Sequence, residues 1–155
     1  MATPLLVMIG LPGSGKTTVA QQLAPPPAII STDAIRAELF GDEATQGPWP
    51  LVEARLTARL LAAKTTPGQS GPLIYDATNA VRRQRRRFIQ QIRQMGFGPI
   101  YGYWLDIPLA LCLARNQQRS RQVPRSVIER MHRCLSGAPP QLRDGFDGLV
   151  RISPL

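Results

Sequence analysis

Eight consecutive residues near the N-terminus, from Gly10 to Thr17, have the spacing G-x-x-x-x-G-K-[ST]. Glycines adopt backbone angles that other residues avoid, so such a loop can close round an anion with its N–H groups pointing inward. A helix that starts at the end of the loop adds the positive end of its dipole. The pattern therefore predicts a site for the phosphates of a nucleotide. The residues predicted to contact these phosphates are Gly10, Pro12, Gly13, Ser14, Gly15, Lys16, Thr17 and Thr18.

Two side chains at the end of this pattern have separate chemical roles. Lys16 supplies a mobile cation for the outer phosphates and is a predicted catalytic residue. Thr17 supplies a hydroxyl for Mg²⁺, which prefers oxygen ligands. The expected ligands are therefore a nucleoside triphosphate and Mg²⁺, and the alternative is a simple glycine turn before a helix.

A carboxylate follows the second apolar run of the chain. Asp33 comes directly after it, where it can face the outermost phosphate and accept a proton from an acceptor hydroxyl. Arg36 lies one helical turn further on, on the same face, and can hold an anionic group of the acceptor. The alternative role for Asp33 is to cap the helix that follows.

Three polar residues follow the third apolar run. Asp76 can act through a metal-bound water or orient Arg36, and Thr78 and Asn79 are predicted to line the acceptor side together with it. The alternative is a capping turn that leads into the next helix.

Arginines are concentrated in two further stretches. Residues 115–125 carry four of them between two predicted helices, and this stretch is a candidate lid over the triphosphate. Within it, Arg115 and Arg119 lie one turn apart and can reach the same phosphates, where such a lid presents guanidinium groups to the transferred phosphoryl. Residues 82–87 carry five arginines at the start of a helix, where cations oppose the helix dipole. An acceptor strand could relieve that conflict, although a solvated helix face is the simpler interpretation.

Short apolar runs alternate with helical patterns along the whole chain. Strands are predicted at residues 5–9, 28–30, 73–75, 100–105 and 149–152. Helices are predicted at 17–24, 51–66, 81–95, 108–117 and 124–135, with another ending at residue 40, while three prolines at 25–27 end the first. This alternation predicts an α/β fold: a three-layer P-loop NTPase sandwich with a five-stranded parallel sheet, helices on both faces and a short helical lid, forming one domain over residues 1–155.

Composition narrows the expected partners and location. The 155 residues include 19 basic and 10 acidic ones, a net charge of +9, and 17 of the basic residues are arginines. So basic a chain favours polyanionic partners, above all nucleic acid. No run is long enough to span a membrane and no secretory signal precedes the first strand. Cys112 and Cys134 lack metal-ligand spacing, which is typical of reduced thiols in a cytoplasmic protein.

Five segments in order resemble the kinase domain of polynucleotide 5′-hydroxyl kinases, and more widely small bacterial P-loop kinases, zeta-toxin-like proteins and seryl-tRNA kinases. These segments are GLPGSGKT, STDAIR, DATN with a basic helix after it, RNQQR…VP, and the ending APPQLRDGFDGLVRI. The resemblance implies that Lys16 and Thr17 bind ATP and Mg²⁺ and that Asp33 is the general base. It further implies that Arg36 contacts the acceptor's phosphate, that Arg119 acts at the transferred phosphoryl, and that residues 137–140 hold the adenine.

The predicted function is thus transfer of the γ-phosphoryl group of ATP to a hydroxyl, with the 5′-hydroxyl end of a nucleic acid as the expected acceptor. Two alternatives stay open. One is a kinase for a small molecule such as a metabolite, an antibiotic or a nucleotide sugar. The other is a regulator that binds ATP without transferring phosphate.

Overall fold

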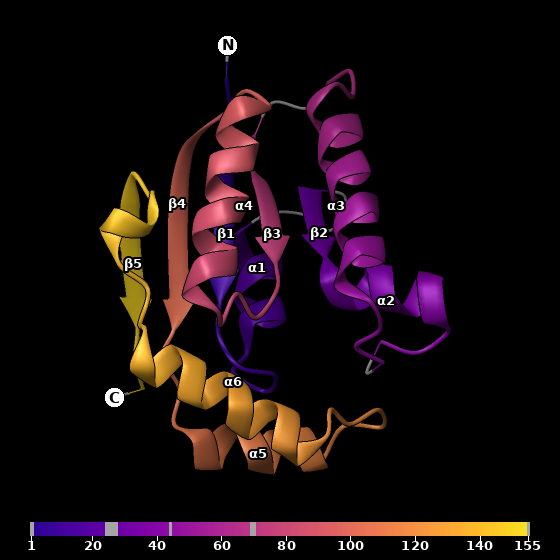
Figure 1. Cartoon of the computed structure of the whole chain (residues 1–155), viewed down its shortest axis with the longest axis vertical. Helices are drawn as coiled ribbons and strands as arrows, with labels where there is room; N and C mark the ends of the chain where they lie inside the picture. The colour runs from indigo at the N-terminus through magenta and orange to yellow at the C-terminus, as the bar shows by residue number, and fades with distance from the viewer. Residues whose placement is uncertain (1, 24–27, 44, 69–70, 155) are drawn as a thin grey trace.

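Five parallel strands form the central sheet of the protein (Figure 1). The structure, a computed structural model, describes residues 2–23, 28–43, 45–68 and 71–154. The strand order is β2-β3-β1-β4-β5, so β1 lies in the middle with β3 and β4 on either side. The strands are β1 (Thr3–Ile9), β2 (Ile29–Ser31), β3 (Leu73–Asp76), β4 (Phe97–Leu105) and β5 (Gly148–Ile152). The predicted α/β fold with a parallel sheet is confirmed.

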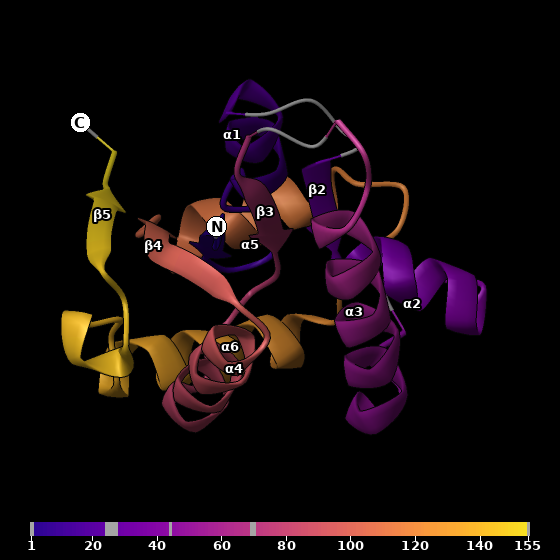
Figure 2. The ribbon, with the colours of Figure 1, turned by 90° about the horizontal axis from the view of Figure 1, so that it is seen from above.

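Helices cover both faces of this sheet. Viewed from above, α1 lies on one side of the strands and α3, α4 and α6 on the other (Figure 2). The helices α5 and α6 cross the ends at which the strands finish (Figure 1). The helices are α1 (Lys16–Leu23), α2 (Thr32–Phe40), α3 (Trp49–Lys64), α4 (Arg82–Gln94), α5 (Leu109–Gln117) and α6 (Arg125–Gly137), with a short 3₁₀ helix, η2 (Leu142–Asp144). The prolines at 25–27, predicted to end α1, lie outside the described residues.

The central strand β1 is buried on both faces, as its continuous apolar sequence predicts. Leu5, Val7 and Ile9 belong to the larger core beneath α3, α4 and α6. Leu6 and Met8 belong to a smaller core beneath α1. Because β1 is held from both sides, the loop that follows it begins from a fixed position.

β4 begins earlier than the sequence predicts. We expected residues 96–99 to separate α4 from β4, whereas the strand already starts at Phe97. Thr3 lies opposite Phe97 and Leu5 lies opposite Ile100, so β4 contains one residue more than β1 over this stretch. Such a bulge accommodates Pro99, which cannot donate a ladder hydrogen bond.

The interior of α4 also differs from the expectation. The sequence predicts that Phe88 and Ile92 are buried while the arginines are solvated. The residues of α4 that are buried are Arg85, Ile89 and Ile92, and Arg85 is only 1% exposed. The predicted solvated face is therefore wrong for Arg85.

No helix in the described ranges is long and apolar enough to cross a membrane. Cys112 and Cys134 are both free thiols.

Candidate functional site

The loop between β1 and α1 has the backbone of an anion-binding cradle. Gly13 and Gly15 have φ angles of 85° and 94°, a region that favours glycine. A Cβ atom on Gly13 would lie 2.5 Å from the carbonyl oxygen of Cys112 on α5, so a side chain is also excluded sterically. The loop closes through the N–H of Ser14, which donates to the carbonyl of Leu11 at 3.0 Å.

Ser14 carries a buried hydroxyl with no partner within the described chain. The residue is 3% exposed, yet its Oγ makes no hydrogen bond. A buried polar group without a partner is costly, and such groups are rare in folded proteins. Its position inside the cradle fits a phosphate oxygen as the missing acceptor.

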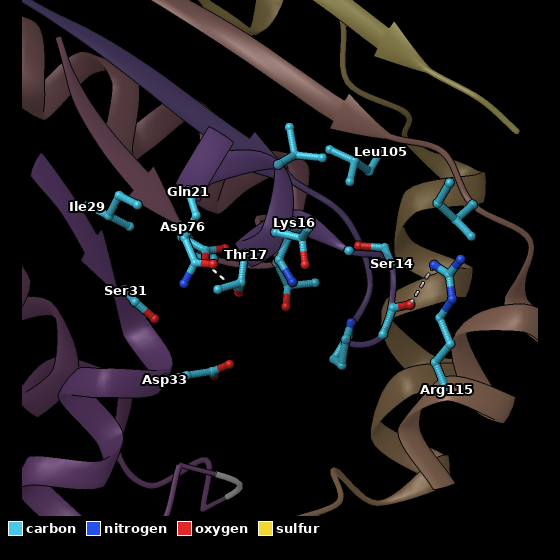
Figure 3. A pocket seen from close by; sticks show the side chains of 18 of the residues that line it. Ser14, Lys16, Thr17, Gln21, Ile29, Ser31, Asp33, Asp76, Leu105 and Arg115 are labelled. Carbon is cyan, nitrogen blue, oxygen red and sulfur yellow. Dashed lines mark hydrogen bonds between the residues drawn. The ribbon is translucent and has the colours of Figure 1, made fainter. Parts of the chain in front are cut away.

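Lys16 and Thr17 begin α1 and face the same space (Figure 3). The ammonium of Lys16 makes only a long contact, 3.4 Å, with the carbonyl oxygen of Leu11. Thr17 Oγ1 donates to Asp76 Oδ2 at 2.8 Å, and Asp76 is 4% exposed. Asp76, which the sequence predicted to act through a metal-bound water or to orient Arg36 on the acceptor side, thus lies against the predicted metal ligand.

The Thr17 hydroxyl and the Asp76 carboxylate suit Mg²⁺, which needs few protein ligands, better than a metal that is coordinated by protein side chains alone. Among the described residues, no three His, Cys, Asp or Glu side chains gather into a metal site. Mg²⁺ commonly takes one or two protein oxygens and fills its other positions with water and substrate phosphates. Thr17 and Asp76 beside a phosphate cradle match that pattern.

Asp33 lies in the first turn of α2 and lines the same cavity. Its side chain is 47% exposed, and Arg36 Nη1 lies 3.7 Å from its Oδ1, so the predicted i,i+3 pair forms. The helix is capped by Ser31, whose Oγ accepts from the N–H of Ala34. Capping therefore does not explain Asp33. Arg36 donates through Nε to the carbonyl of Gln46 at 3.2 Å, and Arg36 is not among the residues that line the cavity.

Thr78 and Asn79 are placed differently from one another. Thr78 lines the cavity, as predicted, whereas Asn79 is not part of its lining. The side-chain amide of Asn79 donates to the carbonyl of Met8 at 2.7 Å. This amide is thus engaged inside the fold.

The predicted lid comprises the end of α5, a loop over residues 118–124 and the first residue of α6. Arg115 and Arg119 both line the cavity. Arg115 donates to the carbonyl of Gly13 at 3.3 Å, and Arg119 Nη2 lies 3.5 Å from a carboxylate oxygen of Glu43. Both contacts are long, so two guanidinium groups line this cavity with weak partners.

The phosphate loop, Asp33, Asp76, Thr78 and the two lid arginines line one cavity of about 980 Å³, at the upper end of the range for small-molecule sites. Sequence reasoning missed part of its wall. The missed lining residues with a bearing on function are Glu43, Leu105, Ile107, Ile152, Ser153 and Pro154. The sequence could have indicated them in one way: several lie at or after the ends of β4 and β5, and parallel sheets bind ligands at these strand ends.

A second, smaller cavity of about 240 Å³ lies between α6 and the end of β4. Pro139, from the segment that the resemblance assigns to adenine, lines this cavity and not the large one. Leu11 lines only the small cavity, while Leu105 and Ile107 line both.

The thiol nearest to the loop is not a nucleophile. Cys112 is fully buried, and this burial raises the pKa of its thiol, so the protonated form persists. Its Sγ lies 3.8 Å from the carbonyl of Ile107.

The fold and the cradle together define a protein with a P-loop nucleotide-binding fold, in which a parallel sheet presents a phosphate loop at the end of its central strand. A family model described as "AAA domain" matches residues 5–137. The chain belongs to this family. No curated protein matches the chain in sequence.

Solved structures share the fold at low sequence identity. A chain of the Pnkp1/Rnl/Hen1 RNA repair complex is 24% identical with a TM-score of 0.70, and the match covers 94% of this chain and 47% of that one. The chain thus spans about half the length of that protein. A sugar kinase from Janibacter sp. HTCC2649 is 21% identical, with a TM-score of 0.57 and coverage of 99% and 86%. A gluconokinase from Sinorhizobium meliloti 1021 is 18% identical, with a TM-score of 0.56 and coverage of 98% and 82%.

Proposed function

We propose that the protein is an ATP-dependent kinase that transfers a phosphoryl group to a hydroxyl, with the 5′-hydroxyl end of a nucleic acid as acceptor. The observation that supports transfer most directly is that one cavity is lined by both the phosphate loop and Asp33. Nucleotide capture needs only the loop. A carboxylate across the cavity is what a hydroxyl acceptor needs in addition.

The nucleotide follows the loop into α1. Backbone N–H groups and the Ser14 hydroxyl donate to the inner phosphates, and the Lys16 ammonium stays close to the outer ones. The adenine lies between Arg115 and the chain after β5, because Ser153 and Pro154 line the same cavity. This placement replaces residues 137–140, which the resemblance suggests.

Thr17 and Asp76 would hold Mg²⁺ through their oxygens. A divalent ion held there would supply positive charge beside the phosphates. Asp76 is fixed for this task by its hydrogen bond from Thr17 and by its burial.

Asp33 orients the acceptor hydroxyl and takes its proton. The hydroxyl oxygen bonds to the γ-phosphorus as the bond from that phosphorus to the ADP oxygen breaks, and the proton passes to the carboxylate. Arg119 stabilises the charge that spreads over the transferred group. Closure of residues 115–125 excludes water from the step.

The acceptor is inferred from charge. A net charge of +9 favours a polyanion, and Arg36 beside Asp33 suits a phosphate next to the reacting hydroxyl. A structural neighbour from an RNA repair complex is consistent with this choice. One observation favours a small, hydroxyl-rich acceptor instead: Glu43 lines the cavity near Arg119, and a carboxylate there repels phosphate but accepts hydrogen bonds from hydroxyls.

A labelled-acceptor screen tests the proposal. The protein is incubated with γ-³²P-ATP and either 5′-hydroxyl oligonucleotides or pools of sugars and other metabolites. Lys16→Ala and Asp33→Ala should abolish transfer, while Asp33→Ala should still bind ATP. Glu38→Gln is the matched control, because Glu38 is an exposed carboxylate of α2 that pairs with Arg55 and Arg59 outside the cavity.

The outcomes separate the candidates. Label on oligonucleotides alone supports the nucleic-acid acceptor, and label on a metabolite alone supports the small-molecule kinase. ATP binding with no labelled acceptor would leave a nucleotide-binding regulator. Full transfer by the Asp33→Ala protein would refute Asp33 as the base.

A further inference from the structure

Two asparagines, Asn79 and Asn116, fix the two loops that face each other across the nucleotide cavity. Each one ties its loop through its side-chain amide to backbone groups, and neither lines the cavity itself. The loop of Asn79 follows Asp76, on the metal side. The loop of Asn116 carries Arg119, on the lid side.

Asn79 joins the loop after β3 to the end of β1. Its Nδ2 donates to the carbonyls of Met8 at 2.7 Å and Ala77 at 3.4 Å. Beside it, the N–H of Gly10 donates to the carbonyl of Thr78 at 3.1 Å. Asn79 has a φ of 51°, a conformation that asparagine tolerates better than most residues. The loop that contains Asp76 is therefore held directly to the start of the phosphate loop.

This loop is also anchored from behind. Arg85, buried in α4, donates through Nη1 to the carbonyls of Asn79 at 3.1 Å and Ala80 at 3.0 Å. The backbone at Asn79 is thus fixed from one side by α4 and from the other by β1. A shift of this residue would move Asp76 relative to Thr17, which α1 holds independently.

Asn116 closes the lid loop in a comparable way. It is 4% exposed, its Nδ2 donates to the carbonyl of Val123 at 2.8 Å, and its Oδ1 accepts from the N–H of Val123 at 3.1 Å. The N–H of Arg119 donates to the backbone carbonyl of Asn116 at 3.2 Å. Residues 117–122 are thereby held as a closed loop with Arg119 near its start.

We propose that Asn79 and Asn116 are positioning residues for opposite halves of the site, Asn79 acting through Asp76 on the metal and Asn116 acting through Arg119 on the terminal phosphate. The inference rests on the nucleotide and Mg²⁺ binding of the proposed function, and it does not require phosphoryl transfer. It reassigns Asn79, which the sequence placed among the acceptor ligands.

Isothermal titration calorimetry with ATP and ADP, each with and without Mg²⁺, gives two ratios. The first is the gain in ATP affinity on adding Mg²⁺, and the second is the preference for ATP over ADP. Asn79→Gly keeps the left-handed backbone and removes the amide. It should lower the first ratio about tenfold, as for groups that orient a metal ligand, and leave the second unchanged. Asn116→Ala should do the reverse, lowering the ATP preference about tenfold.

Double variants make the assignment sharper. If Asn79 acts through Asp76, Asn79→Gly should have no further effect on the first ratio in an Asp76→Asn background. If Asn116 acts through Arg119, its substitution should not change the second ratio in an Arg119→Ala background. Asn116→Ser keeps a small polar side chain without burying a charge, and it serves if the alanine variant does not fold.

Each result decides the matter. The crossed pattern supports the proposal, because a general loss of stability would lower both ratios together or neither. Equal changes in both ratios, or no change, would overturn it. Binding without transfer would refute the kinase but not this inference, whereas an unsubstituted protein that binds no nucleotide would overturn both.

Discussion

The protein contains two arginine-rich segments that look alike in sequence and differ in structure. In α4, Arg85 is buried and uses three nitrogens: Nε contacts Asp144, Nη1 contacts the Asn79 and Ala80 carbonyls, and Nη2 contacts Ala138. In residues 115–125, Arg115 and Arg119 face the cavity with contacts of 3.3 and 3.5 Å. The first segment contributes to the fold, and the second is available to a ligand.

The difference depends on which acceptors the fold supplies. Asp144 is fully buried and accepts from both Arg85 and Arg86, so it pairs with two of the five arginines at the start of α4. Burial, followed by the charges of Arg82 and Arg86, lowers the pKa of Arg85, and the carboxylate of Asp144 opposes that shift. Within the described part of the chain, Arg115 donates only to a backbone carbonyl of the phosphate loop. A cluster of arginines is therefore a candidate binding site only if the fold provides weak partners for its charges.

The largest effect is expected from Arg119→Ala. The transfer rate should fall by roughly 10³-fold or more, as for arginines that contact a transferring phosphoryl group. The free energy of unfolding should change by less than about 0.5 kcal/mol, because the side chain is partly exposed and its ion pair is long. Rapid-quench kinetics and urea denaturation measure the two quantities. A folded variant with normal transfer would remove the lid arginine from the mechanism.

Arg85→Ala should show the opposite pattern, with a loss of about 3–5 kcal/mol in the free energy of unfolding. The reason is that Asp144 is left as a buried charge without its main partner. Arg87→Ala is the matched control, since Arg87 lies on the same helix, is 69% exposed and pairs with Glu53 only at 3.8 Å. Equal unfolding free energies for the two variants would contradict the structural role of Arg85. Arg85→Met combined with Asp144→Leu should recover part of the loss.

These two segments show what the sequence could and could not predict. The phosphate loop is a continuous stretch, so its chemistry is visible without a fold. Asp33 and Asp76 were expected near it because the ends of parallel strands meet at one edge. The partner of Arg85 lies 59 residues away, and no local pattern predicts that pairing. Ser153 and Pro154 reach the cavity only because β5 returns beside β4.

The orientation of the Asn79 side chain could not be predicted from the sequence either. Asn79 was expected to face the acceptor because it follows Asp76 and Thr78. Its positive φ turns its amide toward the carbonyl of Met8 instead. This orientation depends on how close the loop after β3 lies to the end of β1, and a sequence pattern does not predict that distance.

A third arginine of α4 gives a smaller effect that depends on pH. Arg93 pairs with Asp147 at 2.9 Å, but both side chains are about 40% exposed, so the pair is worth less than about 1 kcal/mol. The N–H of Ile100 and then Arg93 lower the pKa of Asp147. A lowered carboxyl pKa stabilises the fold above the unfolded value of about 4 and loses this effect as the pH falls through the folded value.

Asp147→Asn should therefore unfold more easily than the parent protein at pH 7, and the difference should shrink as the pH falls below the unfolded value of about 4. Thermal unfolding across this range measures it. If the difference in stability between the two proteins grew as the pH fell, the pKa of Asp147 would be raised rather than lowered. That result would contradict the hydrogen bond from the Ile100 N–H. Comparing this variant with Arg85→Ala then shows how much more a buried arginine–aspartate pair stabilises the fold than an exposed one.

The smallest effect concerns the arginines of α4 that the fold does not pair. Arg82 and Arg83 make no hydrogen bond or ion pair with the described residues, whereas Arg85, Arg86 and Arg87 all have acidic partners. If a nucleic-acid acceptor follows the start of α4, only the unpaired arginines can exchange counterions for phosphates. Arg82→Glu and Arg83→Glu should each weaken oligonucleotide binding and lower the slope of log K against log salt by about 1.

Fluorescence anisotropy of a labelled oligonucleotide at several salt concentrations measures that slope. Arg87→Glu is the control, because its charge is already partly offset by Glu53, and it should change the slope less. An unchanged slope in the Arg82 and Arg83 variants would exclude α4 from the acceptor path. The lid arginines would then be the only arginine-rich segment at which this protein meets phosphate, and its remaining positive charge would be a solvated surface.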